Sequence, residues 1–188
     1  ILAGAGKAQL QLGDSIGSSF EDSPAGSEFD FVLAHPPWGM KINPAFNQGY
    51  PVQTEAWSNQ LLQKSLKQLK PGGKAIFVLA RGMLFGRGQD KVFREWLLNE
   101  HQVEAVIDLP EDVYAPVTSI AACILIVKAG GKTGKVRMID AAPLFEKPNR
   151  GQAAPIDDQN IMRLTHEVNS DEPLENGWDL NLLDLEKI

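Results

Sequence analysis

Continuous apolar runs, without the alternation of half-buried strands, recur along the chain and constrain its fold more than any other feature. They are FDFVLA at residues 29–34, KAIFVLA at 74–80, VEAVIDLP at 103–110 and SIAACILIVKAG at 119–130. Runs of this length that are rich in Val, Ile and Leu are typical of strands buried on both faces of a sheet. They therefore predict a sheet with a layer of structure on each side.

Two segments between these runs have helical spacing of apolar residues, at 55–69 and 90–101. The alternation of strands and helices predicts right-handed crossovers and a mainly parallel α/β sheet. The loop between the last two runs, residues 111–118, is too short to contain a crossover helix. Residues 103–110 and 119–128 are therefore expected to pair antiparallel.

The remaining elements are shorter. Residues 8–12 read as a strand that ends at turn formers, 135–141 as an edge strand, 40–54 as a long loop and 157–167 as a short helix. These patterns predict a main domain over residues 1–140. Residues 141–188 are expected to form a C-terminal extension that packs on this domain or is partly flexible.

Composition excludes several classes of protein. The net charge of −6 argues against a free-standing nucleic-acid binder that works by neutralising phosphates. Because no apolar run is long enough to span a bilayer, a cytoplasmic protein without a membrane partner is expected. The single cysteine, Cys123, lies in an apolar run and is expected to be a buried thiol. No metal site is expected either, because His101 and His166 lack partners at ligand spacing and are predicted to lie on the surface.

The stretch His35-Pro36-Pro37-Trp38 directly follows the first long apolar run. Neither proline can donate a ladder hydrogen bond, so the pair ends the strand and gives a rigid turn. In an open parallel sheet, ligands bind outside the carboxyl ends of the strands. An aromatic ring held there by two prolines is a flat stacking surface for a planar heterocycle, such as a base taken out of its duplex.

FDFVLAHPPWG resembles the fourth motif of amino-directed DNA methyltransferases, which in the N6-adenine enzymes reads Asn or Asp, Pro-Pro and an aromatic residue. Around it, GDSI, SNQLLQKSLKQLKPGGKAIFVLARGMLF and FREWLLNEHQVEAVIDLPEDVYAPVTSIAACILIVKAG follow in the order and spacing of one family. The series resembles the catalytic domain of the modification subunits of type I restriction-modification systems. The resemblance covers roughly residues 8–182.

The resemblance implies a class I S-adenosylmethionine-dependent methyltransferase fold, which is Rossmann-like, with strand order 3-2-1-4-5-7-6 and strand 7 antiparallel. This sequence supplies counterparts of strands 3–7. Strands 1 and 2, the glycine-rich loop and the acidic residue that binds the cofactor ribose have no counterpart in it. The implied partners are DNA, specificity and restriction subunits, and the missing N-terminal half of the same domain, and the implied cofactor is S-adenosylmethionine.

By the same resemblance, His35, Pro36, Pro37 and Trp38 are the catalytic residues. The first side chain and the backbone carbonyl after it accept hydrogen bonds from the adenine amino group, and the aromatic ring stacks on the flipped base. His35 departs from the family pattern, because an imidazole reaches and points differently from an amide. A retained base-binding role and a degenerate or repurposed site both remain open for His35, and Trp38 has a core ring as its plainer alternative.

Further site residues carried over are Asp14, Ser15 and His35 for the cofactor, and Trp38, Phe46, Tyr50 and Arg81 for the flipped base and DNA. Asp14 is equally well a turn-forming aspartate. Phe46 and Tyr50 belong to the loop that closes over the target base, although packing of a surface loop is a plainer role. Arg81 would meet DNA phosphates, with a solvated surface arginine as the alternative.

These features predict an adenine-N6 DNA methyltransferase fragment that is inactive as an isolated chain, because the first cofactor motif is missing and His35 replaces Asn or Asp. The alternative is a non-catalytic, degenerate methyltransferase-like module for binding or assembly.

Overall fold

The computed structural model describes residues 12–13, 15–16, 29–43, 45 and 49–182. These residues form one sheet of six strands in the order β1-β2-β4-β3-β5-β6. The strands are β1 (Phe29–Ala34), β2 (Leu69–Ala80), β3 (Gln102–Asp108), β4 (Ala122–Lys128), β5 (Lys135–Asp140) and β6 (Gly177–Asn181). The α-helices are α1 (Trp57–Lys67), α2 (Gln89–Glu100) and α3 (Asp158–Asn169), and the 3₁₀ turns are η3 (Arg81–Leu84), η4 (Glu111–Tyr114) and η5 (Ala142–Leu144).

Strand β4 lies between β2 and β3 and runs antiparallel to both. The expected antiparallel pair is thereby confirmed, with Val106 opposite Leu125. Strands β1 and β2 pair parallel, and so do β3 and β5. At the far edge, β6 pairs antiparallel with β5. This last strand was not anticipated, because residues 177–181 are few and lack a continuous apolar run.

The expected helices appear close to their predicted positions, whereas the start of β2 differs from the prediction. The apolar run was predicted to begin at Lys74, whereas β2 begins at Leu69 and includes Lys70, Pro71, Gly72 and Gly73. The pairing with β1 is irregular at this point, since Phe29 lies opposite Leu69 but Phe31 lies opposite Lys74. Of the strand expected at 8–12, residues 8–11 lie outside the described residues.

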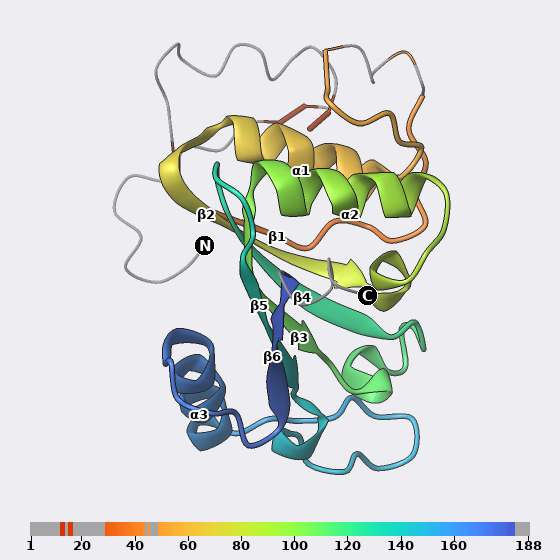
Figure 1. The fold of residues 1–188 in the computed structure, drawn as a ribbon. Helices are drawn as coiled ribbons and strands as arrows, with labels where there is room; N and C mark the ends of the chain where they lie inside the picture. Colours follow the sequence, from red (N-terminus) through yellow and green to blue (C-terminus); the bar gives the residue numbers. More distant parts are fainter. Residues whose placement is uncertain (1–11, 14, 17–28, 44, 46–48, 183–188) are drawn as a thin grey trace.

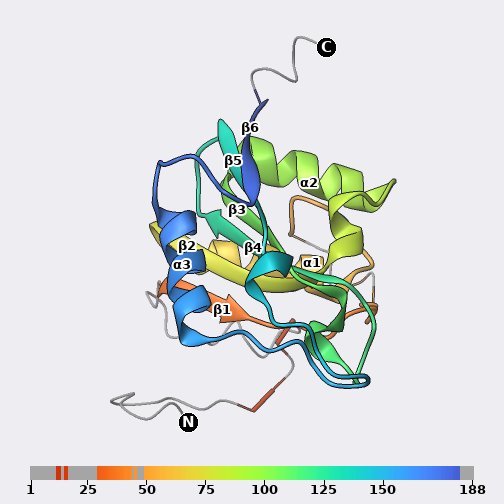
Figure 2. The same ribbon diagram turned by 90° about the horizontal axis from the view of Figure 1, so that it is seen from below.

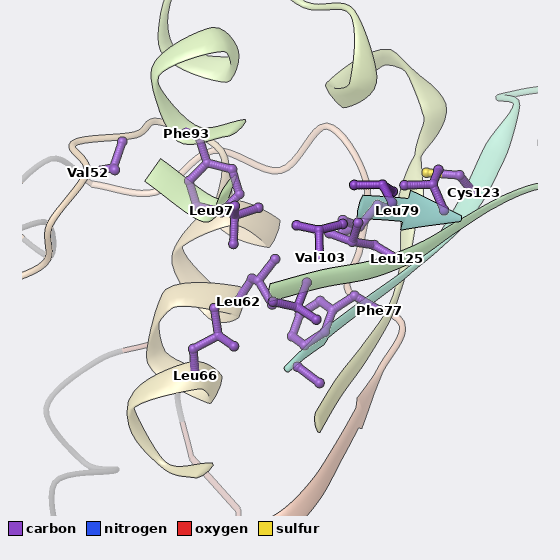
Figure 3. Close-up of a cluster of buried hydrophobic side chains, with 14 of the residues drawn as sticks. Val52, Leu62, Leu66, Phe77, Leu79, Phe93, Leu97, Val103, Cys123 and Leu125 are labelled. Carbon is purple, nitrogen blue, oxygen red and sulfur yellow. The ribbon is translucent and has the colours of Figure 1, made fainter. Parts of the chain in front are cut away.

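Helices α1 and α2 lie side by side and cover one face of the sheet (Figure 1). The apolar stripes of both helices meet the inward residues of β2, β3 and β4 and form the larger core cluster. Figure 3 shows members of this cluster, among them Leu62 and Leu66 of α1, Phe93 and Leu97 of α2, and Phe77, Leu79, Val103, Cys123 and Leu125 of the strands. Among the described residues, no helix is both long and apolar enough to cross a membrane.

The opposite face of the sheet is only partly covered by the described residues. Helix α3 lies on this side (Figure 2) and packs Leu164 and Val168 against the smaller core cluster. Between α3 and the sheet remains a hollow of about 600 Å³ whose floor includes Ile76, Ile124 and Ile126. On β1, Phe31 and Leu33 are 67% and 76% exposed. The prediction of a sheet covered on both faces therefore holds for one face and only in part for the other.

Arg137 of β5 fastens α3 to the sheet and is 4% exposed. Its Nε and Nη2 donate to the two carboxylate oxygens of Asp179 in β6, at 3.0 and 3.3 Å. Its Nη1 donates to the carbonyls of Glu167 and Ser170 at the end of α3, and Nη2 also donates to Glu172 O at 2.9 Å. A cation at a helix C-terminus stabilises the last carbonyls. The described part of the C-terminal extension is thus joined to the main sheet by a strand and by the contacts of a buried arginine.

Replacing Arg137 with Met should lower the free energy of unfolding by about 2–4 kcal/mol, because three carbonyls would lose their donor and Asp179 would lose one of its two cationic partners. Urea unfolding measures this loss. Lys135→Met is the matched control: Lys135 also pairs with Asp179 but is half exposed, so its loss should cost less than about 1 kcal/mol. Equal effects of the two substitutions would contradict the role of Arg137.

Candidate functional site

The chain leaves the sheet at the carboxyl end of β1 through His35, Pro36, Pro37 and Trp38. Pro36 is buried, Trp38 is half-buried, and His35 and Pro37 are exposed. The indole Nε1 of Trp38 donates to the carbonyl oxygen of Val78 in β2 at 3.2 Å. Because the two prolines have no N–H, they cannot donate to β2, and Trp38 supplies a donor just beyond the last paired residues of β1. The expected stacking ring is therefore fixed to the sheet through its polar edge.

Three rings meet at this edge of the sheet. The centroids of His35 and Trp38 are 5.2 Å apart, and Tyr114 lies 5.1 Å from His35 and 5.2 Å from Trp38, edge-on to the indole. Offset and edge-to-face arrangements at such distances are favourable for aromatic pairs. Burial raises the pKa of the Tyr114 hydroxyl above its ordinary value. We call His35, Trp38 and Tyr114 the aromatic cluster.

Sequence reasoning missed Tyr114. The signal was present, because an aromatic residue in the loop after residues 103–110 lies at the carboxyl end of a strand, as Trp38 does. The antiparallel insertion of β4 brings that loop beside the end of β1. The contact between Trp38 and Tyr114 could not be predicted from the sequence, because the two residues lie far apart in the chain.

The loop after Trp38 is fastened to α1 at both ends. Near its start, Trp57 N donates to Met40 O at 3.0 Å. Near its end, the Gln63 amide bonds Val52 twice, accepting from the Val52 N–H at 2.9 Å and donating to the Val52 carbonyl at 3.0 Å. Both bonds are buried, so Gln63 serves Val52 as a neighbouring strand would.

Tyr50, an expected base-contacting residue, lies against the last turn of α1. The ammonium group of Lys67 is 4.3 Å from the centroid of its ring. Trp57, at the start of α1, bonds Met40 and lines a hollow with Pro37, whereas Lys67 is the last residue of this helix. The structure thus does not join Tyr50 to the cluster, and its contact with a base stays a prediction. Phe46 lies outside the described residues.

A hollow of about 440 Å³ brings Ser15 next to Pro37. Its other lining residues are Gly13, Ile16, Met40, Lys41, Ile42, Asn43 and Trp57. Asp14, the main cofactor candidate, lies outside the described residues. Apolar walls with a few polar groups suit the adenine end of a nucleoside. The described residues lining this hollow include no carboxylate that could bind a ribose.

Arg81, expected to meet DNA phosphates, forms an ion-pair network at the ends of β2 and β3. Its Nη1 lies 2.9 Å from Asp108 Oδ2, and its Nη2 lies 3.4 Å from Glu111 Oε1. The hydrogen bond to Asp108, more than any other contact, raises the pKa of the Arg81 guanidinium. The other oxygen of Asp108, Oδ1, is buried and has no hydrogen-bond partner among the described residues. Contact of Arg81 with DNA stays a prediction.

The remaining titratable candidates are structural. Cys123 is fully buried, and burial raises the pKa of its thiol to about 12, as expected for a core cysteine. The prediction that His101 lies on the surface holds only in part, because its half-buried ring packs edge-on against Trp96 and its Nδ1 accepts from Gly130 N–H at 3.0 Å. Burial lowers the pKa of His101. His166 is exposed, as predicted.

The family model described as N-6 DNA Methylase matches residues 2–184, nearly the whole chain. The chain belongs to this family. The methylase subunit of the type I restriction enzyme MjaVII from Methanocaldococcus jannaschii is 28% identical over 181 residues, which are 86% of the chain and 30% of that protein. The methylase subunit of the type I restriction enzyme EcoEI from Escherichia coli is 29% identical over 58% of the chain and 23% of that subunit. The chain thus spans less than a third of the length of these relatives.

Solved structures agree on the fold of this N-6 DNA methylase family member. The type I restriction-modification methyltransferase subunit from Streptococcus thermophilus superposes with a TM-score of 0.80 at 23% identity, over 93% of the chain and 39% of that subunit. A putative class I S-adenosylmethionine-dependent methyltransferase from Listeria monocytogenes gives a TM-score of 0.53 at 16% identity, over 76% of the chain and 43% of that protein. The expected class I methyltransferase fold is confirmed.

Trp38→Phe should lower the free energy of unfolding by about 1–2 kcal/mol, because the Val78 carbonyl loses its donor while an aromatic ring is retained. Urea unfolding followed by circular dichroism measures the change without relying on tryptophan emission. Trp178→Phe is the control, since Trp178 is 59% exposed and its replacement should change stability by less than about 0.5 kcal/mol. Indistinguishable effects would refute the anchoring of Trp38.

Proposed function

We propose that this chain is the C-terminal part of the catalytic domain of an adenine-N6 DNA methyltransferase, within a type I modification subunit. The observation that carries the proposal is the His35-Pro36-Pro37-Trp38 turn at the carboxyl edge of a class I methyltransferase sheet, with Tyr114 beside it. The family match over residues 2–184 and the type I methylase relatives support the choice of an adenine in DNA as substrate.

In the proposed reaction, this chain's residues bind and orient the target base. The aromatic cluster offers π surface to a base flipped out of the duplex, and stacking of this kind is worth about 1–3 kcal/mol per base. An imidazole nitrogen of His35 and the carbonyl of Pro36 accept hydrogen bonds from the amino group. These two acceptors hold the nitrogen so that its lone pair points at the methyl donor. Methyl transfer by direct displacement requires no nucleophilic residue of the chain.

S-adenosylmethionine, when bound, supplies an electrophilic methyl group on a sulfonium. The described residues fit one end of it: the hollow beside Ser15 and Pro37 has apolar walls that suit the adenine ring. Asp14 is proposed as the partner of that ring. The ribose and the positively charged sulfonium of S-adenosylmethionine need binding groups of their own. We propose that a preceding N-terminal half of the domain supplies these groups.

The proposed missing half would add strands to the sheet and cover the face that the described residues leave open. Phe31 and Leu33 on β1 are exposed, and the hollow of about 600 Å³ is floored by isoleucines. Exposed apolar surface of this kind marks an interaction site. Specificity and restriction subunits and DNA are the further proposed partners, by analogy with the type I enzymes among the relatives. The net charge of −6 suggests that much of the DNA affinity comes from those partners.

A second candidate function rests on His35, which stands where the family has Asn or Asp. If its imidazole cannot hold the amino group, the domain is a degenerate, non-catalytic module for binding or assembly. Titration calorimetry of the longer gene product with S-adenosylmethionine separates the two, since the module is expected to bind the cofactor weakly or not at all.

The 188-residue chain alone should transfer no labelled methyl group from S-adenosylmethionine to adenine-containing DNA. The longer gene product with its specificity subunit should produce N6-methyladenine. Digestion of the DNA and mass spectrometry of the nucleosides measure both. Methylation by the isolated chain would overturn the proposed incompleteness, and absence of methylation by the complete assembly would favour the non-catalytic module.

His35→Asn in the longer gene product should raise kcat/KM for methylation about tenfold, because an amide oxygen is a better-directed acceptor for the adenine amino group; tenfold corresponds to about 1.4 kcal/mol. His166→Asn makes the same replacement at an exposed residue of α3 and should leave the rate unchanged. An unchanged rate for His35→Asn would show that this position does not limit catalysis.

A further inference from the structure

Arg81 connects two loops at the candidate site. We propose that Arg81 is a positioning residue: through Glu111 it fixes the η4 turn, and so places Tyr114 against Trp38 and His35, in place of binding a DNA phosphate. The functional meaning of the inference rests on the proposed function, whereas the geometry does not depend on it.

The contacts of Arg81 span the gap between β2 and η4. Its backbone N–H donates to Ala121 O at 2.8 Å, which fixes the end of β2 to the residue before β4. Its guanidinium then reaches Asp108 at the end of β3 and Glu111 at the start of η4, at 2.9 and 3.4 Å. The planar fork of arginine suits this double contact, which a lysine ammonium cannot reproduce with the same geometry.

Glu111 and Tyr114 are the first and last residues of η4. In a 3₁₀ helix, side chains three residues apart lie one above the other on the same side. A contact to Glu111 therefore restrains the side of the turn from which Tyr114 also projects. The rotation of this single turn decides whether the tyrosine ring stays 5.2 Å from Trp38.

The same turn is supported from the C-terminal extension. Ala154 N–H donates to Asp112 O at 3.1 Å, a backbone contact that holds the turn in place but carries no side-chain direction. Within the turn, Val113 N–H donates to Pro110 O at 3.2 Å and Val117 N–H donates to Tyr114 O at 2.9 Å. The contact between Arg81 and Glu111 adds a side-chain restraint to these backbone contacts.

Local charge argues against a phosphate at Arg81. One guanidinium faces two carboxylates, Asp108 and Glu111, so the network is net negative before any ligand arrives. A phosphate would have to displace Glu111 while remaining close to Asp108, and like charges at such distances repel. The Nη1 and Nη2 groups of Arg81 already have carboxylate partners.

The test is a spectroscopic measurement on the folded chain. The indole N–H signal of Trp38, assigned with Trp38→Phe, should shift in Arg81→Gln and in Glu111→Gln, and the double substitution should shift it no further than the larger single effect. Arg87→Gln is the matched control, because Arg87 also follows β2 but is exposed. An unmoved Trp38 signal in Glu111→Gln, or additive shifts, would overturn the inference.

Arg81→Lys keeps the positive charge beside Asp108 without the fork, and should give part of the shift of Arg81→Gln. Glu111 is 75% exposed in its side chain, so Glu111→Gln tests the same contact even where an Arg81 variant does not fold. A Trp38 indole signal at the wild-type position in Arg81→Lys would show that a positive charge alone places Tyr114, which would contradict the inference.

DNA binding by the longer gene product separates the two roles of Arg81. Arg81→Gln should leave the slope of log affinity against log salt unchanged, whereas a lost phosphate contact would reduce it by about 0.9. Glu111→Gln should not tighten binding. A reduced slope together with tighter binding by Glu111→Gln would assign Arg81 to DNA and overturn the inference. If the assembly binds no DNA at all, the proposed function fails while the Trp38 signal still decides the positioning role.

Discussion

The antiparallel insertion of β4 between β2 and β3 is the constraint on which the rest of the structure depends. Strand β4 pairs along its length with both neighbours and is almost entirely buried. Its direction follows from the short connection after β3, which leaves no room for a crossover helix. As a result, the loops after β1, β2 and β3 open at one edge, where Trp38 contacts Tyr114 and Arg81 pairs with Asp108 and Glu111.

The candidate site combines a rigid loop with one residue, His35, that differs from the family motif it resembles. Trp38 is anchored by its indole N–H, and the loop after it is fastened to α1 by backbone contacts and by Gln63. Such fixed surroundings favour a preorganised binding surface. His35 is exposed between two rings and stands where the family carries Asn or Asp. The base-binding site that we propose therefore has a rigid scaffold, and its proposed chemistry depends on one acceptor.

The two faces of the sheet differ in how far the described residues cover them. One face is closed by α1 and α2, whereas the other is partly closed by α3, which a buried Arg137 holds in place. The exposed apolar residues of β1 lie on the uncovered side of this arrangement. A domain whose cofactor-binding half lies in a separate segment would show this asymmetry, because the surface between the halves is core in the complete domain.

The sequence by itself determined the α/β class, the helices, the antiparallel pair and the turn after β1, because apolar periodicity, short loops and consecutive prolines act locally. The rest was decided by tertiary structure. The contact of Tyr114 with Trp38, the network of Arg81, the half-buried His101 and the pairing of β6 each join residues far apart in the chain. Such contacts depend on strand order and register, which the local sequence pattern does not encode, so only the folded chain shows them.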